Sequence, residues 1–376
     1  MGEQEVKSIF DFASKELSGS AFWAWVLYEA FEKKEEKNKA AEALGKALLE
    51  KINKEFEPKL EPNVVKGVRT ELSIKNEAEP KNNLPKSGKV DIALLGENEK
   101  PLVFIENKHF STPNVDDVIK QVSDYAKMVK GDPIRVIMTW RHDTASQWKA
   151  LDEKDENGIC FLSLEKQVGL IGGVKPKDSP MVQAYDDYIS KLKEKRKNRI
   201  DELGENFSQM SDDVWKNDDS LYEMMLLLTS DIKEDLRVYT GTSYGRPWVQ
   251  AAFCEPEHEE NNKPKHHKAF FYRLDRDKGG MYLRLNCYTS TKQNKEHIVK
   301  LFKDKGFHKN EITKPFSWAP SYVNGKETTL MKTYLVRKNG GKTPETKFNS
   351  VKLFQPQLLT FHQKLIKLAE EAIKTL

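Results

Sequence analysis

The sequence predicts a mixed α/β protein: an N-terminal core in the order helix, strand, strand, strand, helix, strand, and a C-terminal α+β domain. Three observations lead to this prediction. Helical stripes of 3.6-residue period and short β-branched runs share the first 165 residues. After about residue 238, strand-like runs dominate. At 376 residues, the chain is also long enough for two domains, each with its own core.

Two helices are expected first, over residues 20–34 and 36–58. The first is apolar on nearly all sides, which indicates burial. The second carries one apolar stripe and ends at Pro58. A run rich in β-branched residues predicts a strand at 64–74, and the Pro- and Asn-rich segment 77–88 predicts a loop.

The next segments complete the predicted core. VDIALL (90–95) and PLVFIENKH (101–109) flank the polar turn GENEK and predict a β-hairpin. Asn114 is a suitable N-cap for a helix that Gly131 and Pro133 end. IRVIMTW (134–140) then predicts a short buried strand.

The remainder of the chain divides into a charged helical part and a strand-rich part. We predict an N-terminal α/β domain at 1–170, a helical connector at 171–237 and a basic α+β domain at 238–376. In the last domain, strands are expected at 269–274, 281–288 and 328–338, and helices at 294–306 and about 355–374. The segments 241–248 and 316–326 are predicted to be loops.

Charged residues at the hairpin are the first sign of function. Side chains alternate between the faces of a strand, so Glu106 and Lys108 point the same way. The hairpin brings Asp91 towards the same end of the sheet. Two neighbouring carboxylates repel each other and are costly to desolvate. A hard divalent cation would relieve that repulsion, and a lysine could position water beside a phosphate, so the pattern predicts metal-assisted phosphodiester hydrolysis.

The spacing of Asp91 and Glu106-Asn107-Lys108 resembles the D…(D/E)-x-K signature of the PD-(D/E)XK nuclease superfamily. FWAWVL (22–27), VDIAL, IENKH and QVSDYA (121–126) are similar to its restriction-endonuclease-like prokaryotic branch, in which a Gln-x-x-x-Tyr helix follows the E-x-K strand. Val90 stands where the motif name has Pro. The resemblance implies a restriction-endonuclease-like αβββαβ core and a Mg²⁺- or Mn²⁺-dependent endonuclease.

The resemblance also implies roles for individual residues. Asp91, Glu106 and Lys108 would be catalytic, and Gln121 would line the site from the helix. An additional acid often comes from the first helix or strand of such cores, where Glu16, Glu29 and Glu71 are candidates. Glu71 is favoured because it lies inside an apolar strand, which gives Asp91, Glu106 and Glu71 as the expected metal ligands.

The charge distribution suggests a polyanionic partner for the second half. From residue 262 to 346 there are 19 Lys and Arg against 7 Asp and Glu, with aromatic residues interleaved. Basic side chains would neutralise phosphates, and exposed aromatic rings would stack on unpaired bases. We therefore expect nucleic acid as the partner. By analogy with the family, DNA is favoured over RNA, and a restriction or anti-phage role is expected.

Other readings remain open at this stage. The chain could be a nuclease-fold binding protein or regulatory subunit that no longer cuts, although the intact Asp91, Glu106 and Lys108 argue against it. It could also cleave RNA. A homodimer would suit cutting of both strands of a duplex. Three widely separated cysteines, and the lack of a secretory or membrane-spanning segment, favour a cytoplasmic location away from membranes.

Overall fold

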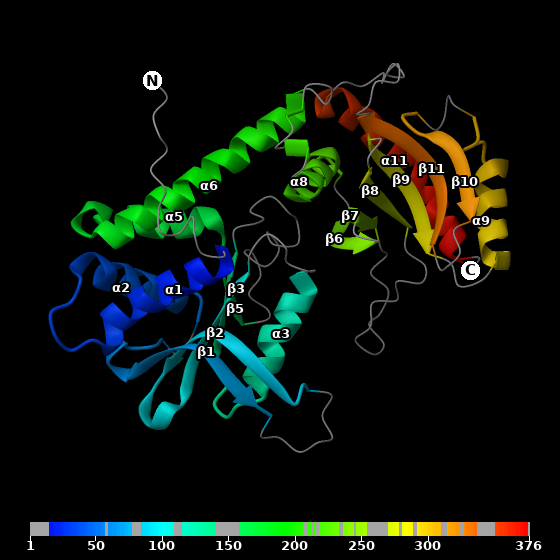
Figure 1. The fold of residues 1–376 in the computed structure, drawn as a ribbon. Coiled ribbons are helices and arrows are strands. Elements are labelled where there is room, and N and C mark those ends of the chain that lie inside the picture. Colours follow the sequence, from blue (N-terminus) through cyan, green and yellow to red (C-terminus); the bar gives the residue numbers. More distant parts are fainter. Residues whose placement is uncertain are drawn as a thin grey trace, which may run out of the picture. The chain divides into compact units, whose positions relative to one another are not determined.

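The computed structural model is shown in Figure 1. It describes residues 15–56, 59–76, 84–108, 115–139, 158–205, 210–211, 214–215, 218–232, 236–243, 246–253, 270–277, 280–288, 292–309, 314–322, 327–336 and 350–374. The chain forms two compact units, residues 1–196 and 197–376. A sheet lies in each unit, so the mixed α/β class predicted from the sequence is confirmed. The functional domain limits at 170 and 237 stay predictions.

The first unit contains a mixed sheet in the order β1-β2-β3-β4-β5. Its first three strands, β1 (Gly67–Lys75), β2 (Ser87–Leu95) and β3 (Pro101–Lys108), are antiparallel neighbours. Strand β4 (Ile134–Thr139) runs parallel to β3, and β5 (Ile159–Leu162) runs parallel to β4. A parallel neighbour needs a crossover connection, and α3 (Val115–Lys127) lies between β3 and β4 in the chain.

Helices cover both faces of this sheet. One face packs in a single buried cluster with α1 (Lys15–Leu27), α2 (Lys39–Asn53), α5 (Leu164–Gly172) and α6 (Pro180–Glu205). Ile92 of β2 and Ile105 of β3 belong to that cluster. Because side chains alternate, Asp91 and Glu106 project from the opposite face, where α3 contacts β2, β3 and β4. The candidate site therefore lies on the α3 side of the sheet.

The first predicted helix is divided in the structure. It is α-helical to Leu27 and continues as a π-helix, η2 (Tyr28–Glu32). Helix α2 then begins after Asn38, whose Oδ1 accepts a hydrogen bond from the Ala41 N–H at 3.0 Å. A predicted single helix over 20–34 is thus correct in position but misses its wider last turn.

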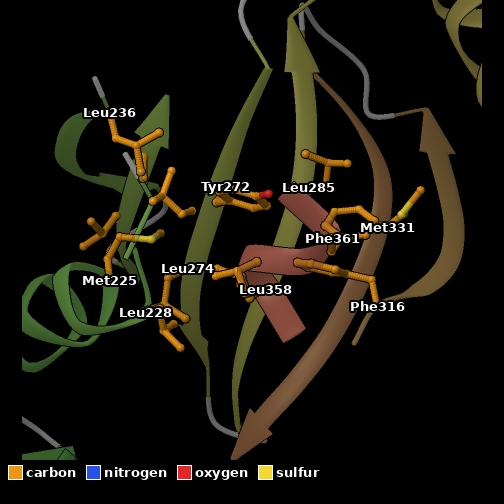
Figure 2. Close-up of a cluster of buried hydrophobic side chains, with 14 of the residues drawn as sticks. Met225, Leu228, Leu236, Tyr272, Leu274, Leu285, Phe316, Met331, Leu358 and Phe361 are labelled. Atoms are coloured by element: carbon orange, nitrogen blue, oxygen red, sulfur yellow. The ribbon is translucent and has the colours of Figure 1, made fainter. Parts of the chain in front are cut away.

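The second unit is built on an antiparallel sheet in the order β10-β11-β9-β8-β7-β6. Its strands are β6 (Leu236–Ser243), β7 (Arg246–Phe253), β8 (Phe270–Asp277), β9 (Gly280–Tyr288), β10 (Ser317–Tyr322) and β11 (Glu327–Val336). Apolar residues of α8 (Asp218–Thr229), α9 (Lys292–Asp304) and α11 (Val351–Lys374) pack on one of its faces. Figure 2 shows this core, in which Tyr272, Leu285 and Phe361 come together.

Four strands of the structure were not expected from the sequence. Strand β5 is absent from the prediction, although its four residues are all buried. The predicted loops 241–248 and 316–326 are wrong where described, because their residues contribute to β6, β7 and β10. Glycine, serine and proline in these segments obscure the strand pattern. Within the described parts of the chain, no helix is long and apolar enough to cross a membrane.

Candidate active site

Asp91 and Glu106 lie where the ladder between β2 and β3 ends. Ile92 and Ile105 are the last paired residues of the two strands in this direction. Continuing the antiparallel register by one residue places Asp91 opposite Glu106. Both side chains project towards α3, so the hairpin register brings the two acids together.

Each of these carboxylates accepts a hydrogen bond from the main chain of the other strand. Oδ2 of Asp91 accepts from the backbone N–H of Asn107 at 2.8 Å. Oε2 of Glu106 accepts from the backbone N–H of Asp91, at a longer 3.4 Å. The side chains thus bind backbone donors just beyond the last paired residues of the ladder.

The other oxygen of the Glu106 carboxylate gathers two side-chain donors. Nζ of Lys108 lies 2.7 Å from Oε1, and Nε2 of Gln121 lies 2.8 Å from the same atom. The Lys108 side chain is 16% exposed, whereas Glu106 is only 1% exposed. The structure therefore brings together four predicted site residues, with Glu106 at the centre and Lys108 on the more accessible side.

Helix α3 holds Gln121 through Tyr125. Nε2 of Gln121 also donates to the Tyr125 hydroxyl at 3.0 Å, one helical turn away. The Tyr125 ring rests directly on Gly88 of β2, where an added Cβ would come within 2.3 Å of Cε1. Only glycine allows this approach, so Gly88 fixes the height of Tyr125 above the sheet.

Asn107, between Glu106 and Lys108, connects the site to the other face of the sheet. Its side chain is buried and donates through Nδ2 to Oγ of Ser20 in α1, at 3.2 Å. Its backbone N–H holds Asp91. Asn107 therefore links the position of α1 to that of the Asp91 carboxylate.

Glu71 lies apart from the four-residue cluster. It stands opposite Asp91 in the register of β1 and β2, but its φ of 51° interrupts the regular strand. Its side chain is 61% exposed, and Oε1 binds Nζ of Lys89 at 3.0 Å. Glu71 thus contributes charge near Asp91 but, in this structure, its carboxylate binds a lysine.

Glu29, one of the two further acid candidates of the sequence, does not join the cluster. Glu29 is buried in η2, where it binds the Lys33 ammonium at 3.0 Å and accepts the Asn38 N–H at 2.8 Å. These contacts stabilise the end of the helix. Glu16 is in α1, and its side chain lies outside the described residues.

Burial shifts the acid–base behaviour of both central carboxylates. Burial raises the pKa of Glu106 to about 7, and repulsion from Asp91 adds to the effect of burial while Lys108 opposes it. Burial also raises the pKa of Asp91; the Asn107 N–H and Lys108 counteract this rise, whereas Glu71 adds to it. The surrounding protein therefore compensates the two negative charges incompletely.

The carboxylate pair suits a hard divalent cation. It offers oxygen ligands, which Mg²⁺ and Mn²⁺ prefer. Two carboxylates also carry more negative charge than the single Lys108 ammonium can neutralise. Among the residues that the structure describes, no group of three or more His, Cys, Asp or Glu gathers as a ligand set. The remaining positions around an ion would have to be filled by water and substrate, as is usual for Mg²⁺.

Sequence reasoning missed two polar residues that act on the site. Lys89 is two residues before Asp91 in β2, and its charge lowers the pKa of Asp91. Strand alternation could have revealed it, since residues i and i+2 share a face. The Asn107 contact to Ser20 had no such signal, because the two residues are 87 positions apart.

A comparison with known families identifies the first part of the chain. The sequence model of the PD-(D/E)XK nuclease superfamily matches residues 7–208, more than half of the chain. No curated protein and no solved structure matches significantly. The matched range contains the whole first sheet and the cluster around Glu106. The chain belongs to the PD-(D/E)XK nuclease superfamily.

Proposed function

We propose that this protein is a Mg²⁺- or Mn²⁺-dependent endonuclease that hydrolyses phosphodiester bonds, most readily in DNA. The observation that carries the proposal is the carboxylate pair of the half-buried Asp91 and the buried Glu106, with the Lys108 ammonium 2.7 Å from Glu106. Family membership supports nuclease activity. The surrounding protein compensates the charges of this pair only incompletely, which is more typical of a functional site than of a structural ion pair.

Asp91 and Glu106 would hold the metal ion. When bound, the ion would supply positive charge to a phosphodiester and so favour its hydrolysis. The Asn107 N–H keeps Asp91 oriented, and Gln121 keeps Glu106 oriented. These contacts fix the donor oxygens before substrate arrives, which lowers the entropic cost of assembling the site.

Lys108 is the residue that we assign to the attacking water. Its ammonium is more accessible than Glu106 and can donate hydrogen bonds to water or to a phosphate oxygen. In that position it would orient the nucleophile and stabilise the negative charge that develops on the phosphate. Neutralising this side chain should therefore reduce turnover more than substrate affinity.

Glu71 would be an additional metal ligand, after Asp91 and Glu106. Its carboxylate would have to exchange Lys89 for the ion, and at 61% exposure it is accessible enough to do so. Without that exchange, it affects the reaction only through its charge, which raises the pKa of Asp91.

The wider setting rests on weaker support and forms part of the same proposal. The basic segment 262–346 supports nucleic-acid binding by residues 238–376, with 171–237 as a helical connector. A restriction or anti-phage role, a cytoplasmic location and a homodimer that cuts both strands follow from the family resemblance and the few cysteines. RNA is the alternative substrate.

The test is cleavage of supercoiled plasmid, single-stranded DNA and RNA with Mg²⁺ or Mn²⁺ and with EDTA. We expect metal-dependent cutting that falls at least 100-fold in Asp91→Asn and Lys108→Ala. Glu99→Gln and Lys46→Ala remove charges that are 79% and 50% exposed and serve as matched controls. Activity that survives both site substitutions would refute the assignment. Metal-independent binding without cleavage would instead indicate a nuclease-fold binding protein.

A further inference from the structure

The face of the C-terminal sheet opposite its helices carries two adjacent rows of side chains. Directly paired residues of antiparallel strands project from the same face. One row runs across β7, β8, β9 and β11 through Trp248, Asp275, Tyr282 and Tyr334. The next row, two residues along each strand, runs through Gln250, Arg273, Arg284 and Lys332. We call these the aromatic row and the basic row.

Helices of the unit pack against the other face. Val249, Leu274 and Leu283 alternate with the members of the two rows and belong to the core that α8, α9 and α11 complete. Figure 2 shows the same core face through Tyr272, Leu274 and Leu285. The two rows are thus outside the hydrophobic core, and their polar and aromatic character is not required for packing it.

One end of the rows is an internally satisfied network. Asp275 accepts from Nε of Arg273 at 3.1 Å and from Nη2 of Arg284 at 2.6 Å. Arg273 also binds Glu327 at 3.0 Å, and its guanidinium lies 5.0 Å from the centre of the Trp248 ring. The arginine side chains are only 11% and 18% exposed, so this end supports the face rather than binding a ligand by itself.

The other end is a platform of two tyrosines and one lysine. Nζ of Lys332 lies 4.3 Å from the Tyr282 ring centre and 4.5 Å from that of Tyr334. The two rings are 5.8 Å apart at their centres. Tyr334 is 37% exposed, and no carboxylate within the described part of the chain pairs with Lys332. The exposed ring of Tyr334 and the partly buried ring of Tyr282 therefore lie beside a positive charge that no described carboxylate neutralises.

This chemistry is complementary to unpaired nucleotides. Tyrosine rings stack on bases of any sequence, and a lysine on a flexible stem can turn from the rings to a phosphate. The surrounding segment 262–346 adds a charge of +12 from its 19 basic and 7 acidic residues. A duplex hides its base faces inside the stack, so it could use the lysine but not the rings. An acidic protein would likewise need no pair of surface rings.

We propose that Tyr282, Lys332 and Tyr334 bind single-stranded nucleic acid, with bases on the tyrosines and a backbone phosphate on Lys332. The inference rests on the proposed nucleic-acid substrate but not on catalysis at Asp91 and Glu106. In this proposal the single-stranded nucleic acid contacts the C-terminal sheet, and the enzyme therefore prefers substrates with unpaired segments.

Binding is measured by fluorescence anisotropy on the full chain carrying Asp91→Asn, in EDTA, so that cleavage cannot contribute. The probes are a labelled single-stranded oligonucleotide and its duplex. We expect the double variant Tyr282→Ala/Tyr334→Ala to weaken binding of the single strand about tenfold for each base that no longer stacks on a tyrosine ring. Binding of the duplex should be unchanged. The matching Phe variants should retain affinity, because they keep the rings. Lys332→Gln should reduce the slope of log K against log salt by about 0.7, the value for one phosphate contact.

Controls separate this outcome from misfolding and from failure of the nuclease proposal. Tyr28→Ala removes a 41% exposed tyrosine and Lys46→Gln removes a 50% exposed lysine, both in the first unit and outside the basic segment. Neither should change single-strand affinity. Unchanged binding in the double tyrosine variant, with a thermal transition like that of wild type, would overturn the proposal. Absence of binding to either probe would also overturn it. Binding without metal-dependent cleavage would refute only the nuclease proposal.

Discussion

The carboxylate of Glu106 accepts the backbone N–H of Asp91 at 3.4 Å, while the carboxylate of Asp91 accepts the N–H of the residue that follows Glu106 at 2.8 Å. Two mutually repelling acids are therefore held together by the strands that carry them. Burial and this repulsion raise the pKa of Glu106. The arrangement costs folding free energy, which is expected of a functional site.

Asp91→Asn should stabilise the metal-free protein while abolishing cleavage. The amide keeps an acceptor for Asn107 and removes the repulsion on Glu106. A gain of about 1 kcal/mol would raise the melting temperature by roughly 2–4 °C in a chain of this size class. Calorimetry in EDTA measures it, with Glu99→Gln as the control at an exposed position. A lower melting temperature would mean that the pair stabilises the fold.

Gln121→Ala should impair turnover without removing the metal ligands. It takes away the 2.8 Å donor to Glu106 and leaves Lys108 as the side-chain donor on Oε1. We expect kcat to fall about tenfold, the loss typical of an orienting contact to a ligand. Tyr125→Phe, which removes the hydroxyl that binds Gln121, should fall by less. Equal losses of kcat in both variants would indicate that the position of helix α3, rather than the Gln121 amide itself, determines turnover.

Gly88→Ala should destabilise the first unit because its Cβ would lie 2.3 Å from the Tyr125 ring. Overpacking of this kind costs about 1–3 kcal/mol. Tyr125→Ala should recover most of that loss when combined with it, which a double-mutant cycle in urea measures. Gly169→Ala in α5 is the matched control, since no atom lies within 4 Å of the added Cβ. It should be neutral or stabilising by up to about 1 kcal/mol.

Glu71→Gly separates the backbone role of this residue from its charge. Its φ of 51° is strained for a residue with a Cβ, so glycine should stabilise the strand pair by about 1 kcal/mol. Glu71→Gln keeps the strain and removes the charge. If Glu71 binds metal, both variants lose activity to a similar extent. If it acts only by charge on Asp91, Mg²⁺ affinity by calorimetry should change by less than about tenfold in both.

The acid stability of the protein should depend on Glu29. Burial favours its neutral form, but the Asn38 N–H and Lys33 outweigh burial, so the pKa of Glu29 lies below the ordinary 4.5. A carboxylate with a lowered pKa stabilises the fold above its unfolded pKa, and the contribution disappears as pH falls through the folded value. Glu29→Gln should therefore be less stable than wild type at pH 7, and the difference should disappear as the pH falls below the lowered folded pKa of Glu29. Urea denaturation at several pH values measures the difference.

The sequence predicts that Asp91, Glu106 and Lys108 lie together, because strand alternation and antiparallel register are local rules. Glu106 and Lys108 had to share a face, and the hairpin could bring Asp91 to the same end. Gln121 was identified through the resemblance to the Gln-x-x-x-Tyr helix of the family, and in the structure Gln121 donates a hydrogen bond to Tyr125. These positions depend on few residues and short separations.

Long-range and strain-dependent features could not be predicted in this way. No residue pattern signals the positive φ of Glu71. Glu29 looked like a catalytic acid but stabilises a π-helical turn, because a buried acid can serve either purpose. Strands β6, β7 and β10 were missed since their neighbours in the sheet, rather than their own residues, determine their conformation.

The end of the ladder at Ile92 and Ile105 has a consequence for how the chain tolerates insertions and deletions. Both acids owe their shared face to one register, which the turn at residues 96–100 transmits from β2 to β3. Sequence changes that preserve the strand pairing should leave the site intact even when the turn is rebuilt. A one-residue slip would instead turn Glu106 and Lys108 together towards α1, leaving Asp91 alone and exchanging the candidate site residues for core residues in one step.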